Sequence, residues 1–227
     1  LDHFHDLKMC GEPVRRPPGA IVLRPCWQCS VKRDGARRSR NCCDGSPRSA
    51  PLLHGIASTC SSCVEQPVQR LFFVLAAREN CQVCGGDTQD AHAHSPPPET
   101  PTFASIDDAC ADWCEHGFKK KLDRSLVLPV LHALQGHPES NKLWEKHITA
   151  IPRPPKFGFK STTHDESICS AIFEGAKMLL LCQVDDFAVA CPNEDIAKRP
   201  CGQIGKALQL PSENTPPFKR LGLIKDF

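Results

Sequence analysis

The sequence predicts an α+β fold. Short apolar runs of strand length are interspersed with segments of helical periodicity, and the two kinds of segment do not follow a strict strand–helix–strand repeat. Prolines stand at the expected starts or ends of helices. With 227 residues, the chain can bury a hydrophobic core as one large domain or two small ones.

In the N-terminal half we expect a strand pair and then a helix. Residues 21–35 read as strands closed by an Asp34-Gly35 turn, a pair typical of hairpins. Pro67 opens the expected helix. Its apolar face should comprise Val68, Leu71, Phe72 and Leu75. A strand-like run then ends at Asp87, and the prolines after Ser95 make the following segment irregular or extended.

In the C-terminal half we expect a helix, a β-hairpin and a second helix. Pro138 should start the first helix, which Pro152–Pro155 ends; its apolar residues are Trp144, Ile148 and Ile151. Residues 178–190 form two short apolar runs, the pattern of a hairpin. Asn193 should cap the second helix, although Pro200 inside it would cost about 3 kcal/mol.

Three acids are candidate metal ligands. Asp185 and Asp186 are adjacent at the expected hairpin tip, and Asp87 ends a separate strand-like run. If the strands bring these acids together, their oxygens can chelate a hard divalent cation. The alternative is ordinary turn chemistry, because Asp-Asp is common in tight turns.

Charge is distributed unevenly along the chain, although its net value is only +2. Residues 24–48 contain seven Lys or Arg and two Asp, whereas residues 85–117 contain seven acids and no Lys or Arg. A basic segment beside an acidic one suits phosphates held near bound metal. Two solvated surfaces of opposite charge are the alternative interpretation.

The fifteen cysteines indicate a competing function. Three pairs have CxxC spacing, Cys26/Cys29, Cys60/Cys63 and Cys81/Cys84, and two such pairs can hold one zinc ion. The pairs lack the usual knuckle glycines, however, and the other cysteines are mostly scattered singly. The odd count in a large chain also argues against a secreted disulfide framework.

The chain contains no tyrosine, although it has eleven Phe. Tyrosine codons differ by one base from those of Cys and His, so we interpret several of these residues as substituted tyrosines. The positions where a half-buried aromatic would be natural are Cys84, His92, Cys110, Cys114, His132, Cys169 and Cys201.

No stretch approaches the length of a membrane span, and the N-terminus lacks the pattern of a signal peptide. We therefore expect an intracellular protein, in a cytoplasmic particle or the nucleus, that is not secreted and has no membrane partner. The chain begins with Leu1 and stops at Phe227, and both ends read as cut from a longer protein.

A series of motifs from about residue 24 to residue 227 carries a family resemblance. In order they are Asp87-Thr-Gln-Asp-Ala, Leu131–Trp144 with Gln135-Gly136, Phe157–Ser161, Val184-Asp-Asp and Phe218–Leu223. The series resembles the reverse transcriptase domain of copia-type long-terminal-repeat retrotransposons. The resemblance implies the fingers and palm of a right-hand polymerase, with an antiparallel palm sheet packed on helices and the thumb missing.

The resemblance implies a two-metal active site. Asp87 and Asp185 would bridge two Mg²⁺ or Mn²⁺ ions, Asp186 would be the less important third acid, and the Thr88 carbonyl would be a further ligand. Asp90 and Ala91 complete the family's first acidic motif.

The resemblance also implies residues that hold the nucleotide and primer. Lys32, Arg38 and Arg40 would reach the triphosphate, and Gln135-Gly136 would pass close to the template–nucleotide pair. His92 stands where many reverse transcriptases have an aromatic beneath the sugar. Gln183, before Val184, stands where the family has the tyrosine that helps to position the primer.

The expected organisation is a fingers-like basic region over residues 1–82 and a palm over residues 83–227. The palm would contain an inserted segment at about residues 95–130, and the thumb and RNase H regions would be absent. The implied activity is RNA-directed DNA synthesis from deoxynucleoside triphosphates on a primed RNA or DNA template. Two alternatives remain open: a cysteine-rich zinc module that binds nucleic acid, and a catalytically dead retroelement remnant.

Overall fold

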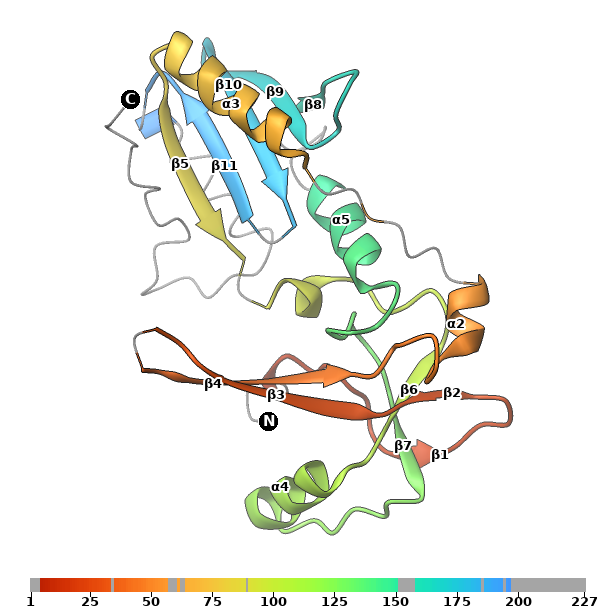
Figure 1. The fold of residues 1–227 in the computed structure, drawn as a ribbon. Coiled ribbons are helices and arrows are strands. Elements are labelled where there is room, and N and C mark those ends of the chain that lie inside the picture. The colour runs from red at the N-terminus through yellow and green to blue at the C-terminus, as the bar shows by residue number, and fades with distance from the viewer. Residues whose placement is uncertain are drawn as a thin grey trace. The chain divides into compact units, whose positions relative to one another are not determined.

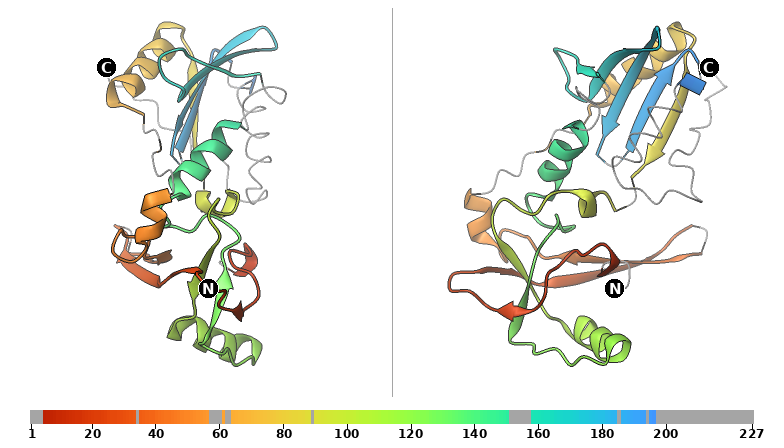
Figure 2. Two further views of the ribbon diagram at one scale, coloured as in Figure 1. Left: turned by 90° about the vertical axis from the view of Figure 1, so that its right-hand side faces the viewer. Right: turned by 180° about the vertical axis from the view of Figure 1, so that it is seen from behind.

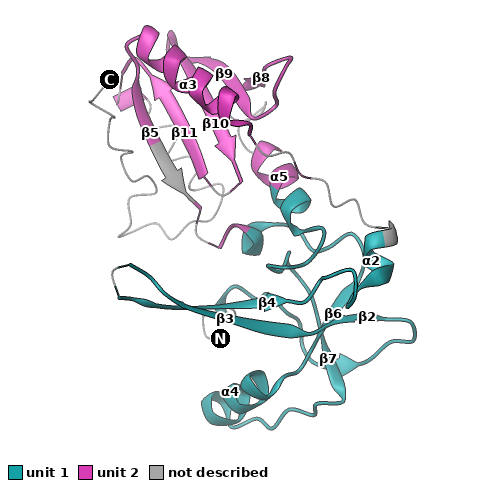
Figure 3. Cartoon of the chain, viewed as in Figure 1, with its two compact units in different colours: residues 1–60, 92–144 teal, residues 61–91, 145–227 magenta. Residues whose placement is uncertain are grey.

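A computed structural model describes residues 5–33, 35–56, 61, 64–88, 90–150, 158–184, 186–193 and 195–196. Strands and four α-helices are mixed in this part of the chain, which confirms the α+β class. The chain divides into two compact units (Figure 3), each interrupted in sequence by the other. Unit 1 comprises residues 1–60 and 92–144, and unit 2 comprises residues 61–91 and 145–227.

Unit 1 contains a small mixed sheet and a separate two-stranded ribbon. The sheet has the order β1 (Val14–Arg15), β7 (Leu126–Pro129), β6 (Thr102–Ser105), β2 (Ile21–Leu23). The ribbon is β3 (Pro25–Val31) paired with β4 (Arg37–Cys43). The helices assigned wholly to this unit are α2 (Pro51–Ile56) and α4 (Asp108–Phe118). Leu23, Leu53, Ala104 and Leu134 lie in its buried core.

The expected strand pair near residues 21–35 is present with different bounds. Residues 21–23 pair with β6, in parallel, and the hairpin starts only at Pro25. Gly35 lies in the turn with a φ of 81°, a left-handed conformation that favours glycine. The second strand of the ribbon, β4, begins at Arg37, so Arg37, Arg38 and Arg40 all lie on this strand.

Unit 2 is built on a five-stranded antiparallel sheet covered by a helix. The strand order is β5 (Gln82–Asp87), β11 (Asp186–Cys191), β10 (Ala176–Gln183), β9 (Ile168–Phe173), β8 (Lys160–Ser161). Helix α3 (Gln66–Arg78) lies across one face of this sheet (Figure 1 and Figure 2). Its core includes Phe72, Leu179, Leu181, Ala188 and Ala190.

Helix α3 confirms most of the expected apolar face. Pro67 occupies its first turn, Phe72 is fully buried, and Val68 and Leu75 pack against the core. The assignment of Leu71 was wrong, because its side chain is 51% exposed. Residues 68, 72, 75 and 76 form the buried stripe, and Leu71 lies at its edge on the helical wheel.

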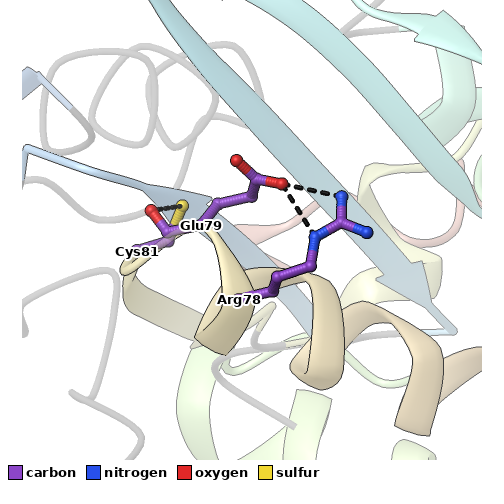
Figure 4. A network of polar contacts seen from close by, with 3 residues as sticks. All are labelled: Arg78, Glu79 and Cys81. Carbon is purple, nitrogen blue, oxygen red and sulfur yellow. Dashed lines mark hydrogen bonds and ion pairs between the residues drawn. The ribbon is translucent and has the colours of Figure 1, made fainter.

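The C-terminus of α3 determines where the edge strand β5 begins. Asn80 adopts a φ of 51°, and the Cys81 N–H donates to the Ala76 carbonyl at 2.8 Å, as in a Schellman motif. Arg78 donates twice to the Glu79 carboxylate, which lowers the pKa of that group (Figure 4). The chain therefore turns sharply and enters β5 at Gln82.

The two later helices are present in part. Helix α5 (Ser140–Ala150) begins two residues after Pro138, because a turn closed by the Ser140 N–H and the His137 carbonyl precedes it. Trp144 and Ile148 are buried as expected. The Asn193 cap is confirmed, since its Oδ1 accepts from the N–H groups of Asp195 and Ile196. Ile151, Pro152–Pro155 and Pro200 lie outside the described residues.

The helices in the described ranges are too short or too polar to cross a bilayer.

Candidate active site

The β10–β11 hairpin places the adjacent acids at one end of the unit 2 sheet. Its last strand pair is Gln183 with Asp186, which leaves Val184 and Asp185 as a two-residue loop. Asp186 begins β11, and its side chain is exposed. The hairpin expected over residues 178–190 is therefore present, with Asp186 at the start of its second strand; Asp185 lies outside the described residues.

The third acid reaches the same end of the sheet through strand pairing. In the β5–β11 register, Asp87 is directly opposite Asp186. The Cα atoms of opposite residues in an antiparallel pair lie about 4.5–5.5 Å apart. The backbone thus brings Asp87 next to the hairpin acids, from a distant part of the sequence.

The side chains of Asp87 and Asp185 lie outside the description, so the register is what defines this site. Among the described side chains, no group of three or more His, Cys, Asp or Glu is placed to hold a metal ion. Aspartate oxygens are the hard ligands that Mg²⁺ and Mn²⁺ prefer. The residue types at this sheet end therefore fit a divalent cation.

Thr88 adds a second observation at the same place. This residue follows Asp87 directly, is only 2% exposed, and its Oγ1 is one of two buried side-chain oxygens without a hydrogen-bond partner in the described part. Such atoms are rare in folded proteins, and bound water or an ion commonly satisfies them. The orphaned hydroxyl is consistent with a polar ligand beside the acids.

The β3–β4 ribbon of unit 1 carries the basic candidates. Arg38 and Arg40 are two residues apart on β4, so they face the same side of the ribbon, opposite Ser30 and Gln28 respectively. Lys32 lies at the tip, where its N–H donates to the Ala36 carbonyl. Lys32 and Arg38 are exposed and Arg40 is half-buried, which leaves charge available to an anionic ligand.

The Gln135-Gly136 turn lies against the end of β4 in unit 1. The Cys43 N–H donates to the Gln135 carbonyl at 2.8 Å. Gly136 has a φ of +90°, and a Cβ there would overlap the Cys43 carbonyl. A Cβ on Gly45 would in turn overlap the Gly136 carbonyl. Glycine at position 136 is thus required for packing within the protein, which the sequence pattern does not reveal.

A buried polar network supports this turn, and sequence reasoning missed it. The Glu139 carboxylate accepts from the Glu99 N–H at 2.8 Å and from the Thr100 hydroxyl at 3.0 Å. His137 lies 3.2 Å from the Thr102 hydroxyl, and burial lowers the pKa of this histidine. Because the partners are more than thirty residues apart in sequence, no local signal could have identified them.

His92, the expected residue beneath the sugar, is half-buried in the short 3₁₀ helix η1 (Ala91–His94). Its Nε2 lies 3.1 Å from Asn141 Oδ1 at the start of α5. This contact orients the ring.

The cysteines behave mostly as small apolar residues. Burial raises the pKa of Cys10 and Cys43 to about 12 and that of Cys110 to about 11, which keeps these thiols protonated. A cavity of about 710 Å³ in unit 1 is lined by several of them, with Trp113 and Phe118. The cysteines around it are Cys10, Cys42, Cys43, Cys110 and Cys114.

The positions interpreted as former tyrosines are all half-buried or buried where the structure describes them; Cys201 lies outside. Cys110 and Cys114 both line the cavity, where an aromatic ring would fill space. Of the CxxC pairs, Cys26 and Cys29 are exposed on β3, and Cys60 and Cys63 are outside the described residues.

No protein-family model and no curated protein sequence matches the chain. Among solved structures, telomerase from Candida albicans, determined in complex with a fragment of telomeric RNA, is similar with a TM-score of 0.42 and 8% sequence identity. The similarity covers 91% of this chain and 42% of that one, so the chain spans less than half of the telomerase. Similarity at this level does not assign a function.

Proposed function

We propose that the chain is a fragment of a metal-dependent nucleotidyltransferase, an RNA-directed DNA polymerase of a copia-type retrotransposon. The observation that carries the proposal is the β5–β11 register, which places Asp87 opposite Asp186 beside the Asp185 hairpin tip. Three acids at one sheet end supply the carboxylates that two divalent cations need. The order of motifs along the sequence supports the same proposal.

In this proposal Asp87, Asp185 and Asp186, with the Thr88 carbonyl, hold two Mg²⁺ or Mn²⁺ ions. When bound, the ions activate the primer 3′-hydroxyl and neutralise charge on the transferring phosphate. Gln183 and Val184 position the primer end. The unit with the five-stranded sheet takes the role of the palm.

The ribbon-bearing unit takes the role of the fingers. Lys32, Arg38 and Arg40 bind the triphosphate of the incoming deoxynucleotide, and the planar fork of arginine suits phosphate oxygens. Gln135-Gly136 contacts the template–nucleotide pair, and His92 stacks beneath the sugar. The template is RNA or DNA with a primer.

Extension of a DNA primer on an RNA template with Mg²⁺ tests the proposal, comparing the chain with Asp185→Asn and Glu174→Gln. Glu174 is the matched control, because it lies in the β9–β10 turn at the other end of β10. We expect slow extension, which Asp185→Asn lowers by about 10²-fold or more and Glu174→Gln leaves unchanged. Primer–template binding should change little.

Mn²⁺ binding provides a readout that does not require turnover. Asp185→Asn should weaken binding and Glu174→Gln should not. Equal effects of the two variants on Mn²⁺ binding, or on extension when the wild type extends the primer, would show that the acid assignment is wrong. If Mn²⁺ binding follows the prediction while no protein extends the primer, the chain retains the metal site of a polymerase whose catalysis has decayed.

A further inference from the structure

The β3–β4 ribbon brings two cysteines directly opposite each other. Cys26 on β3 is the register partner of Cys42 on β4. Opposite residues of an antiparallel pair project from the same face of the ribbon. Cys26 is exposed, whereas Cys42 is only 6% exposed. The pair therefore combines a thiol that solvent reaches with a buried thiol beside it.

The hydrogen-bond pattern fixes the spacing of the pair. The Asp44 N–H donates to the Arg24 carbonyl, and the Lys32 N–H donates to the Ala36 carbonyl. These two bonds lie at opposite ends of the ribbon, and hydrogen-bonded and non-hydrogen-bonded residue pairs alternate between them. Cys26–Cys42 is therefore a hydrogen-bonded pair, for which the Cα separation is about 5.5 Å. Disulfides most often have Cα separations of about 5.5–6 Å. The backbone thus already has the spacing of a disulfide.

We propose that Cys26 and Cys42 form a reversible modification site, a cross-strand disulfide produced by peroxide. The inference does not depend on the proposed polymerase activity. It rests on the register, the spacing and the difference in exposure of the two thiols. Burial and the neighbouring Cys26 also raise the pKa of Cys42, in agreement with their proximity.

The exposed thiol reacts first. The Cys26 thiolate attacks one peroxide oxygen, the O–O bond breaks, and a sulfenic acid and hydroxide form. Cys42 then attacks the sulfenic sulfur, the S–S bond forms, and the released hydroxide takes the Cys42 proton as water. Together, two thiols and one peroxide give one disulfide and two water molecules. A dithiol reductant reverses the modification.

Cys29 offers a matched control on the same strand. It is also exposed, but its register partner is Ser39, whose Oγ lies 3.6 Å from Cys29 Sγ. It lies three positions after Cys26 on the same strand, so it projects from the opposite face of the ribbon. Oxidation at Cys29 therefore cannot form a disulfide with Cys42 in the folded ribbon.

The experiment treats the folded chain with hydrogen peroxide and maps disulfides by mass spectrometry, for the wild type, Cys26→Ser, Cys42→Ser and Cys29→Ser. We expect a link between the segments that contain Cys26 and Cys42, with a loss of two hydrogen atoms that a dithiol reverses. Cys26→Ser and Cys42→Ser should abolish this link, and Cys29→Ser should retain it.

Cys26 is exposed, so its replacement should not prevent folding, which circular dichroism checks. The proposal is overturned if the folded wild type forms no such link, or if Cys29→Ser abolishes the link while Cys26→Ser retains it. The proposal would also be overturned if the link formed in peroxide-treated denatured chain but not in peroxide-treated folded chain.

Discussion

Val184, between β10 and β11, is the residue of this hairpin with the most strained backbone among those described. Its φ is 49°, in the left-handed region that β-branched residues rarely adopt. The two-residue loop between β10 and β11 demands this conformation, because hairpin turns of this length need positive φ values. The other tight hairpin of the sheet uses Glu174-Gly175, with φ values of 49° and 79°.

Val184→Gly should stabilise the protein, since glycine adopts the left-handed region without steric cost. We expect the free energy of unfolding to rise by up to about 1 kcal/mol, measured by urea denaturation. Ile172→Gly is the control, because Ile172 is an exposed strand residue without a positive φ and its replacement should destabilise. Equal destabilisation by both variants would show that the turn is not strained.

At the scale of the element, α3 illustrates how periodicity gives the position of a helix but only an approximate apolar face. The sequence places Leu71 and Phe72 together among the packed residues, yet Phe72 is buried and Leu71 is 51% exposed. The sheet contacts a stripe narrower than the apolar part of the helix. Which apolar residues are packed is therefore decided by the partner surface.

Phe72→Ala and Leu71→Ala should separate these two environments. Removing the buried ring leaves a cavity against β10 and β11, so Phe72→Ala should cost about 3–5 kcal/mol of unfolding free energy. Leu71→Ala should change stability by no more than about 1 kcal/mol. Urea denaturation followed by circular dichroism measures both. A larger loss for Leu71→Ala would contradict the packing described for α3.

At the scale of the whole molecule, the CxxC spacing of Cys26 and Cys29 does not produce the shared zinc site that such a motif usually indicates. Cys26 and Cys29 lie on a regular strand, where residues three apart face opposite sides. A single ion cannot be held by both side chains in that geometry. In the part of the chain that the structure describes, Cys, His, Asp and Glu side chains do not gather into a metal-holding group.

We therefore expect folding that is independent of zinc. Purified protein should contain Zn²⁺ well below one ion per chain, and a chelator should leave its circular dichroism spectrum and unfolding midpoint unchanged. Elemental analysis before and after chelation measures this. Stoichiometric zinc whose removal unfolds the chain would instead favour the cysteine-rich module. Cys60 and Cys63 would then be the first candidate zinc ligands to test by substitution.

Local chemistry in the sequence was sufficient to predict several elements. The Pro67 helix, the hairpin over residues 178–190 and the Asn193 cap all depend on residues that are close together in the chain, so their pattern is visible in the sequence. The predicted ends of the elements were less accurate: α5 begins at Ser140 and the β3–β4 ribbon begins at Pro25. Tertiary pairing and turn bonds move the ends of elements.

The residue types of the candidate site can be read from the sequence: acids after strand-like runs, arginines in one segment and glycine after Gln135. The fold of the chain shows which of these residues are neighbours. It placed Asp87 opposite Asp186, pressed Gly136 against Cys43, joined Glu139 to Thr100 and set Cys26 opposite Cys42. The physical reason is that strand register and buried contacts between distant segments depend on how the whole chain packs, which local periodicity does not encode.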